Sequence, residues 1–126
     1  MPRLLAVLLA SLFASIASAA EPTPTERGKK ALTETAFIPA FWSSRSVPNA
    51  WRQWEGITQR PAEYDAAFRN RYGLHEAPYP NDGLPMGLRK AKTVLGIGVG
   101  ADCMMCHGGS ILGTSYIGLG NSTLDI

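Results

Sequence analysis

The most specific chemistry in the sequence lies in five consecutive residues. The spacing Cys-X-X-Cys-His, which is the attachment signature of c-type haem, occurs at Cys103-Met104-Met105-Cys106-His107. One helical turn presents both thiols to the same edge of a porphyrin, so the two sulfurs can add across its two vinyl groups. The histidine that follows supplies a neutral ring nitrogen as the proximal iron ligand. The motif therefore predicts one covalently attached haem c, held by Cys103, Cys106 and His107.

Three other kinds of site use cysteines at this spacing. A thiol oxidoreductase places Cys-X-X-Cys after a strand in an α/β pattern, and the sequence shows no such alternation of strands and helices. A zinc site needs about four ligands, and beyond the motif the chain offers only His75 or a carboxylate. A structural disulfide between Cys103 and Cys106 would leave the adjacent histidine unexplained. Haem attachment is therefore favoured over these three alternatives.

The second axial ligand of the iron is not fixed by the motif. No His or Met follows His107, so the downstream methionine ligand that is usual in small cytochromes is not expected here. Met86 and His75 are the upstream candidates, and their alternative roles are a core methionine and a loop histidine. If neither binds, the iron keeps an open position or takes an external ligand. No catalytic residue can be assigned.

Two further patterns near the motif have simpler explanations. The stretch at residues 96–101, Gly-Ile-Gly-Val-Gly-Ala, fits a dinucleotide-binding fingerprint, but no crossover helix follows it. We expect its glycines to allow close approach of the backbone to a flat macrocycle. Arg89, Lys90 and Lys92 could pair with haem propionates, but a solvated basic turn is the commoner meaning of such a cluster.

Composition and the first residues indicate one small exported domain. The 126 residues are 45% hydrophobic, with twelve basic against ten acidic side chains, so a nucleic-acid-binding face is not indicated. Arg3 precedes an apolar run at residues 4–16, and residues 17–19 (Ala-Ser-Ala) form a small-residue cleavage pattern. We expect residues 1–19 to be a signal peptide, with a retained membrane anchor as the alternative. The remainder is then periplasmic or secreted, with no stable membrane anchor after cleavage.

The residues around the motif predict short helices joined by loops. Thr25 is placed to cap a helix that begins at Glu26 and ends before Pro39, within an N-terminal lead and helix at residues 20–47. Asp102 is placed to cap the turn that carries the motif. Many glycines and prolines argue against a helical bundle. The other expected elements are a helix at Pro48–Glu55, a helix at Pro61–Tyr72 ended by Gly73, an ordered loop at Gly73–Arg89 and a brief strand at Thr93–Leu95.

Several segments between residues 48 and 126 also have a familiar pattern. They are Arg71-Tyr72-Gly73-Leu74, Ala77-Pro78-Tyr79-Pro80-Asn81, Gly83-Leu84-Pro85-Met86-Gly87, Cys103 to Gly109, Gly118-Leu119-Gly120-Asn121 and Leu124-Asp125. Together they resemble the start of large bacterial periplasmic c-type cytochromes related to di-haem peroxidases and rubber-oxygenase-like proteins. We therefore expect residues 48–126 to form a mainly α, small, loop-rich, cytochrome c-like haem domain.

The resemblance implies further haem domains. In such relatives the first haem commonly handles peroxide or dioxygen, and later haems feed or store electrons. Only Cys103, Cys106 and His107 carry over to this chain. Because the sequence stops soon after His107, in residues 121–126 that resemble a helix being capped and begun, we expect the domain to be truncated at its C-terminus. Residues 121–123 (Asn-Ser-Thr) match a glycosylation pattern, which the resemblance to exported bacterial proteins discounts.

Three functions are consistent with these observations. The first is electron transfer through the covalently attached haem, with redox proteins or further haem domains as partners. The second is the first haem domain of a multi-haem peroxidase or oxygenase with an open iron position, so whether the chain is part of an enzyme is left open. The third is a haem module that senses a diatomic gas.

Overall fold

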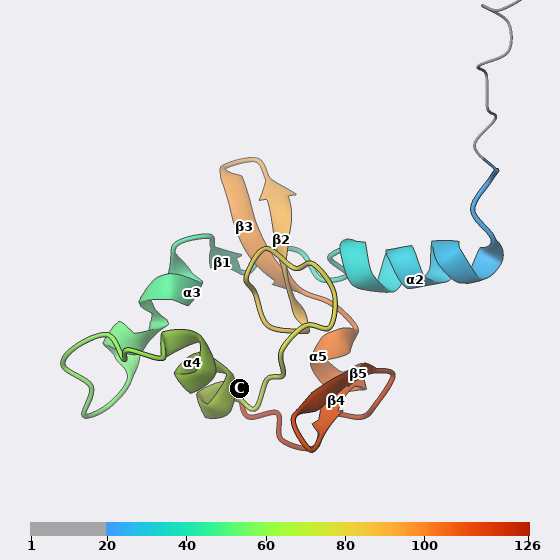
Figure 1. The fold of residues 1–126 in the computed structure, drawn as a ribbon. Coiled ribbons are helices and arrows are strands. Elements are labelled where there is room, and N and C mark those ends of the chain that lie inside the picture. Colours follow the sequence, from blue (N-terminus) through green and yellow to red (C-terminus); the bar gives the residue numbers. More distant parts are fainter. Residues whose placement is uncertain (1–19) are drawn as a thin grey trace, which may run out of the picture.

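Residues 20–126 are described by the structure, a computed structural model, and Figure 1 shows their fold. The predicted signal peptide at residues 1–19 lies outside the described residues. Within residues 20–126, no helix is long and apolar enough to cross a membrane.

The fold is a mixture of short helices and two small antiparallel sheets, so the prediction of a mainly α domain was wrong. Helices make up 30% of the described residues and strands 21%. The first sheet has the strand order β1-β3-β2, and the second consists of β4 and β5. The elements in chain order are α2 (Pro24–Glu34), β1 (Trp42–Ser43), α3 (Ser46–Asn49), the 3-10 helix η1 (Ala50–Gln53), α4 (Tyr64–Tyr72), β2 (Leu88–Thr93), β3 (Gly96–Ala101), α5 (Met104–His107), β4 (Gly108–Ile111) and β5 (Thr114–Ile117).

The glycine-rich segment forms β3, the central strand of the three-stranded sheet. Its residues pair with β2 from Leu88↔Ala101 to Thr93↔Gly96, and with β1 through Trp42↔Val99. The predicted strand at Thr93–Leu95 is therefore wrong, because these residues end β2 and begin the turn into β3. A Cβ atom on Gly98 would lie 2.5 Å from the Cβ of Ala40. The glycines thus allow the segment before β1 to approach the sheet.

The helices are shorter than predicted or begin at other residues. Thr23, not Thr25, caps α2: its hydroxyl accepts from the backbone N–H of Glu26 (3.3 Å), and the Glu26 carboxylate accepts from the N–H of Thr23 (2.7 Å). These bonds lower the pKa of Glu26. The expected helix at Pro48–Glu55 is instead α3 followed by η1. Helix α4 begins at Tyr64 and ends, as predicted, at Gly73, which has φ 60°.

An aromatic cluster between α4 and η1 forms the core. The rings of Trp54 and Tyr64 stack at 5.6 Å, and the rings of Phe68 and Tyr72 lie 4.8 Å apart. Val99 of β3 is buried in the same cluster, which joins it to the sheet. The C-terminal segment returns to α4, where the N–H of Asp125 donates to the carbonyl of Tyr72 (3.1 Å; Figure 1). No helix is present at residues 118–126, so the expectation of a helix beginning there was wrong.

Replacing Gly98 with Ala tests the close approach on β3. The new methyl group would overlap Ala40, and overpacking of this kind costs about 1–3 kcal/mol of unfolding free energy. Gly120→Ala is the matched control, because a Cβ atom there meets nothing within 4 Å. Urea denaturation of the two variants gives the comparison, and equal stabilities would contradict the packing described here.

Candidate functional site

The predicted attachment residues lie together on one exposed turn of helix. Helix α5 spans Met104–His107, and the backbone N–H of His107 donates to the carbonyl of Cys103 (3.0 Å). Cys103 is half-buried, whereas Cys106 and His107 are exposed. Both thiols are free. The turn therefore presents the Cys106 thiol and the His107 imidazole to the outside of the domain, with the half-buried Cys103 beside them, and the predicted helical turn is confirmed.

Asp102 fixes the start of this turn, as predicted. Its Oδ1 atom accepts a hydrogen bond from the backbone N–H of Met104 (2.8 Å). Its Oδ2 atom lies 2.9 Å from Nε and 2.8 Å from Nη2 of Arg89 on β2. Asp102 and Arg89 are 5% and 7% exposed, so this ion pair is buried. The expectation that Arg89 belongs to a solvated basic turn was wrong, because its guanidinium is buried against Asp102. It holds residues 102–107, which we call the attachment turn after the predicted haem attachment, against the sheet.

The loop before β2 closes over the same ion pair. The carbonyl of Gly87 accepts from the backbone N–H of Asp102 (3.0 Å). The ring of Tyr79 lies below the Arg89 guanidinium, with 5.6 Å between the ring centre and the guanidinium carbon. Burial raises the pKa of the Tyr79 hydroxyl, and the charge of Asp102 raises it further. The Tyr79 hydroxyl therefore stays protonated, and its ring packs against the ion pair.

Residues Gly118–Asn121 hold the other end of α5. The N–H of Gly118 donates to the carbonyl of His107 (2.7 Å), and the N–H of Asn121 donates to that of Cys106 (2.8 Å). The Asn121 side-chain amide donates to the carbonyls of Met105 (3.1 Å) and Gly73 (2.9 Å). The last carbonyls of a helix need such partners. A glycan on Asn121 would disrupt these bonds, which supports setting aside its glycosylation pattern.

His75, the first of the two candidate distal ligands, has another role. Its Nδ1 atom lies 3.0 Å from Ser110 Oγ, and its Nε2 atom lies 3.2 Å from Asn121 Oδ1. Because Oδ1 of Asn121 only accepts, Nε2 is the donor to Asn121, and Ser110 Oγ is the hydrogen-bond partner of Nδ1. Both ring nitrogens are therefore engaged in joining the loop after α4 to β4 and to the C-terminal segment.

Met86, the second candidate distal ligand, is a core residue. Its side chain is 1% exposed, and a Cβ atom on Gly108 would lie 2.7 Å from its sulfur. The sulfur thus lies behind the residue that follows His107, inside the domain, whereas Cys106 and His107 are exposed. None of the hydrogen bonds of the described residues involves the His107 ring. The structure therefore brings Cys103, Cys106 and His107 together and leaves His75 and Met86 apart from them.

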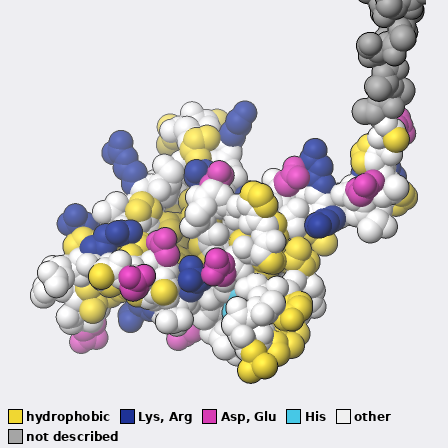
Figure 2. Space-filling model, in the orientation of Figure 1, with side chains coloured by type: hydrophobic (Ala, Val, Ile, Leu, Met, Phe, Trp, Pro, Cys, Tyr) yellow, Lys and Arg dark blue, Asp and Glu magenta, His cyan; other side chains and the backbone are white. Residues whose placement is uncertain are grey.

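Apolar surface borders the attachment turn on two sides. Next to Cys103, a pocket of about 260 Å³ lies between the end of α2 and the turn, with Leu32 and Phe37 in its wall. On the other side, the β4–β5 hairpin exposes Ile111, Leu112 and Tyr116. Figure 2 shows hydrophobic side chains gathered at the surface over this hairpin. A large exposed apolar patch often marks a surface that binds a ligand or another protein.

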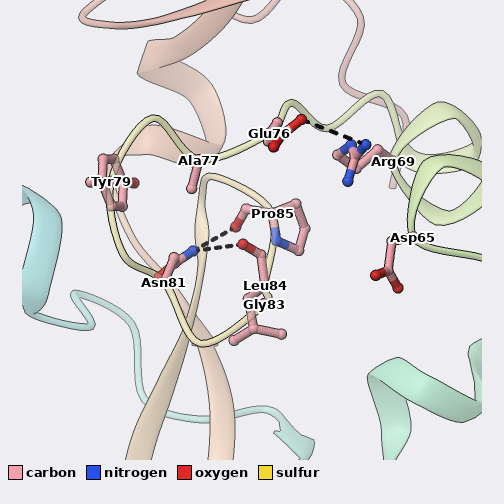
Figure 3. A pocket seen from close by; sticks show the side chains of 9 residues that line it. All are labelled: Asp65, Arg69, Glu76, Ala77, Tyr79, Asn81, Gly83, Leu84 and Pro85. Carbon is pink, nitrogen blue, oxygen red and sulfur yellow. Dashed lines mark hydrogen bonds and ion pairs between the residues drawn. The ribbon is translucent and has the colours of Figure 1, made fainter.

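A different pocket, shown in Figure 3, lies away from the exposed turn. It measures about 220 Å³ and lies between α4 and the loop at residues 76–85. Arg69 pairs there with Glu76 (3.9 Å), and the Asn81 amide donates to the carbonyls of Leu84 and Pro85 (both 3.0 Å). The buried hydroxyl of Tyr79, which also lines this pocket, has no hydrogen-bond partner among the described residues.

The structure also bears on the alternatives for the two cysteines. Among residues 20–126, no group of three His, Cys, Asp or Glu side chains is placed to hold a metal ion. Cys103 follows β3 directly, as in a thiol oxidoreductase, but that strand belongs to an antiparallel sheet with no βαβ unit. No family model and no curated protein matches the chain.

Replacing Arg89 with Met tests whether the buried ion pair holds the turn. The change leaves the Asp102 carboxylate buried without its partner, which costs about 3–5 kcal/mol of unfolding free energy. Lys90→Met is the matched control, because Lys90 forms an exposed ion pair with Asp82 (3.7 Å) that contributes about 1 kcal/mol or less. Chemical denaturation measures both, and similar losses in the two variants would contradict the assigned role of Arg89.

Proposed function

We propose that this chain is a c-type cytochrome that transfers electrons through one covalently attached haem. The observation that carries the proposal is the Cys-X-X-Cys-His motif on a single exposed helical turn, α5, which is braced at both ends. The fold alone does not indicate a function, because small mixed domains serve many functions. The proposal therefore rests on Cys103, Cys106 and His107.

Each cysteine has one chemical task. If haem were bound, the thiols of Cys103 and Cys106 would each add across one vinyl group, with the sulfur bonded to one vinyl carbon and the thiol hydrogen transferred to the other. No oxidant would be required. Both thiols are free, and Cys106 is open to solvent, as this addition needs.

His107 provides the axial nitrogen, and the braced turn keeps it in place. A metal ligand works best when its supporting residues hold its orientation. Here the backbone of His107 is bonded at both its N–H, by Cys103, and its carbonyl, by Gly118. The exposed ring then offers a nitrogen to iron, and a bound haem supplies one-electron redox chemistry at that position.

The surroundings of the turn suit a large apolar group. A porphyrin is mostly hydrophobic, and the pocket beside Cys103 is lined by Ala31, Leu32, Ala36 and Phe37. The charge of Asp102 at its edge is neutralised by Arg89. The exposed side chains of the β4–β5 hairpin extend the apolar surface on the other side of the motif. The residues present therefore fit the group that the motif predicts.

A second candidate function follows from the positions of His75 and Met86. Both side chains are committed to hydrogen bonding or packing within residues 20–126. If His107 held a haem iron, neither of these side chains would serve as its second ligand, and the site would be open to an external one. This favours the first haem domain of a multi-haem peroxidase or oxygenase, or a gas-binding module, as the alternative. Further haem domains or redox proteins in the periplasm are the proposed partners.

The two cysteines provide the decisive test. Expressed in a host that matures c-type cytochromes, the wild-type chain should retain haem after denaturation, and Cys103→Ala combined with Cys106→Ala should retain none. Mass spectrometry and haem staining of denaturing gels measure this. Ser44→Ala in the same host controls for expression, because Ser44 is exposed and carries no thiol. A wild-type protein whose mass is that of the polypeptide alone would refute the proposal.

Carbon monoxide tests the open iron position. Because both candidate distal ligands are engaged elsewhere, the reduced wild-type protein should bind carbon monoxide readily, with a shift of its Soret band. The variants Met86→Leu and His75→Gln should show the same shift. If either substitution were needed before carbon monoxide could bind, that residue would be the distal ligand, and the chain would be a six-coordinate electron carrier.

A further inference from the structure

Helix α2 has little support from the rest of the described domain. It spans eleven residues, of which Thr33 is the one that is buried, and Figure 1 shows it extending sideways from the sheet. Isolated helices shorter than about 12–15 residues are marginal in water. The capping box of Thr23 and Glu26 stabilises its first turn. The second half of α2 therefore depends on packing that residues 20–126 do not themselves supply.

The end of α2 is nevertheless fixed close to the attachment turn. The backbone N–H groups of Phe37 and Ile38 both donate to the carbonyl of Ala101, at 3.2 and 2.9 Å. Ala101 stands two residues before Cys103. The segment that leaves α2 is thus tied to the strand that leads into the motif, and the helix cannot move far from Cys103 without breaking these bonds.

The surface between the end of α2 and Cys103 is mostly apolar. Ala31 and Leu32 lie on the last turn of α2, and Thr35, Ala36 and Phe37 follow the helix. With Cys103 they enclose the pocket of about 260 Å³. Leu32 is 40% exposed and Phe37 is 76% exposed, which is unusual for side chains that line a pocket. The charged group at the edge, Asp102, already has Arg89 as its partner. Thr35 supplies the one hydroxyl of the lining, so the pocket offers little for a polar or ionic occupant to bind.

We propose that this pocket seats the apolar edge of the haem attached through Cys103, so that α2 forms a wall of the cofactor site. This inference rests on the proposed function, because the thioether bond at Cys103 is what delivers the occupant. The pocket is smaller than the 300–1,000 Å³ of typical small-molecule sites, which suits one edge of a macrocycle. The same contact supplies the packing partner that α2 lacks.

Hydrogen exchange tests directly whether the haem edge occupies this pocket. The amides of residues 31–36 should exchange at least about tenfold more slowly in the haem-loaded wild type than in the Cys103→Ala, Cys106→Ala protein, since packing raises the cost of local opening. Amides of α4 serve as the internal reference, because that helix packs in the aromatic core. Equal exchange of α2 in the two proteins would overturn the inference.

Substitution of the wall gives an independent test. Leu32→Gln combined with Phe37→Gln should lower the reduction potential of the haem that is attached, by admitting water to its edge. The matched control is Val94→Gln combined with Leu95→Gln, at the turn between β2 and β3, where both side chains are fully exposed. A potential equal to that of the control would overturn the inference.

The two tests separate this inference from the proposed function. A wild-type protein without covalent haem would refute both, because no occupant would be delivered to the pocket. A haem-bearing wild type in which α2 exchanges as in the cysteine double variant would refute the seat alone and leave the c-type assignment standing.

Discussion

The buried carboxylate of Asp102 connects the sheet to the attachment turn, and the arrangement of the site depends on it. One oxygen caps the start of α5 and the other pairs with Arg89 on β2. A buried charge without a partner is costly, so the strand and the turn must keep their relative positions for both groups to remain satisfied. At the other end of the turn, neutral hydrogen bonds from Gly118 and Asn121 hold the last carbonyls of α5 in place. The backbone around Cys103, Cys106 and His107 is therefore held before any ligand arrives.

The parts of the site that could be predicted from the sequence are those set by neighbours in the chain. The one-turn helix and its cap, Asp102, both follow from residues 102–107. The capping box of α2 was also visible as Thr23-X-X-Glu26, and choosing Thr25 overlooked that spacing. Gly73 was placed correctly because the end of a helix calls for a residue that tolerates positive φ.

The parts that failed depend on residues distant in sequence. β3 was missed because glycine is unfavourable in strands, and only the approach of Ala40 explains why Gly98 stands there. Arg89 was taken for a surface residue because its partner, Asp102, is thirteen positions away. From the sequence, Asn121 was considered as part of a glycosylation pattern, whereas in the structure its amide donates to the carbonyls of Met105 and Gly73. Burial decides the role of each of these residues, and no local pattern in the sequence reports it.

Large apolar side chains are buried around α4 but exposed on both sides of α5, as they also are at the turn between β2 and β3. The aromatic cluster around α4 is buried and satisfied, and it extends to the sheet through Leu88 and Val99. Around α5 the opposite holds, because Phe37 on one side and Leu112 on the other are open to water. A small domain buries a low fraction of its surface, so leaving large apolar side chains exposed is unfavourable unless another group covers them. A macrocycle covalently attached at Cys103 and Cys106 would cover the apolar surface nearest to it. Because the turn is already held at both ends by hydrogen bonds and the buried ion pair, the rest of the fold would not need to change on attachment.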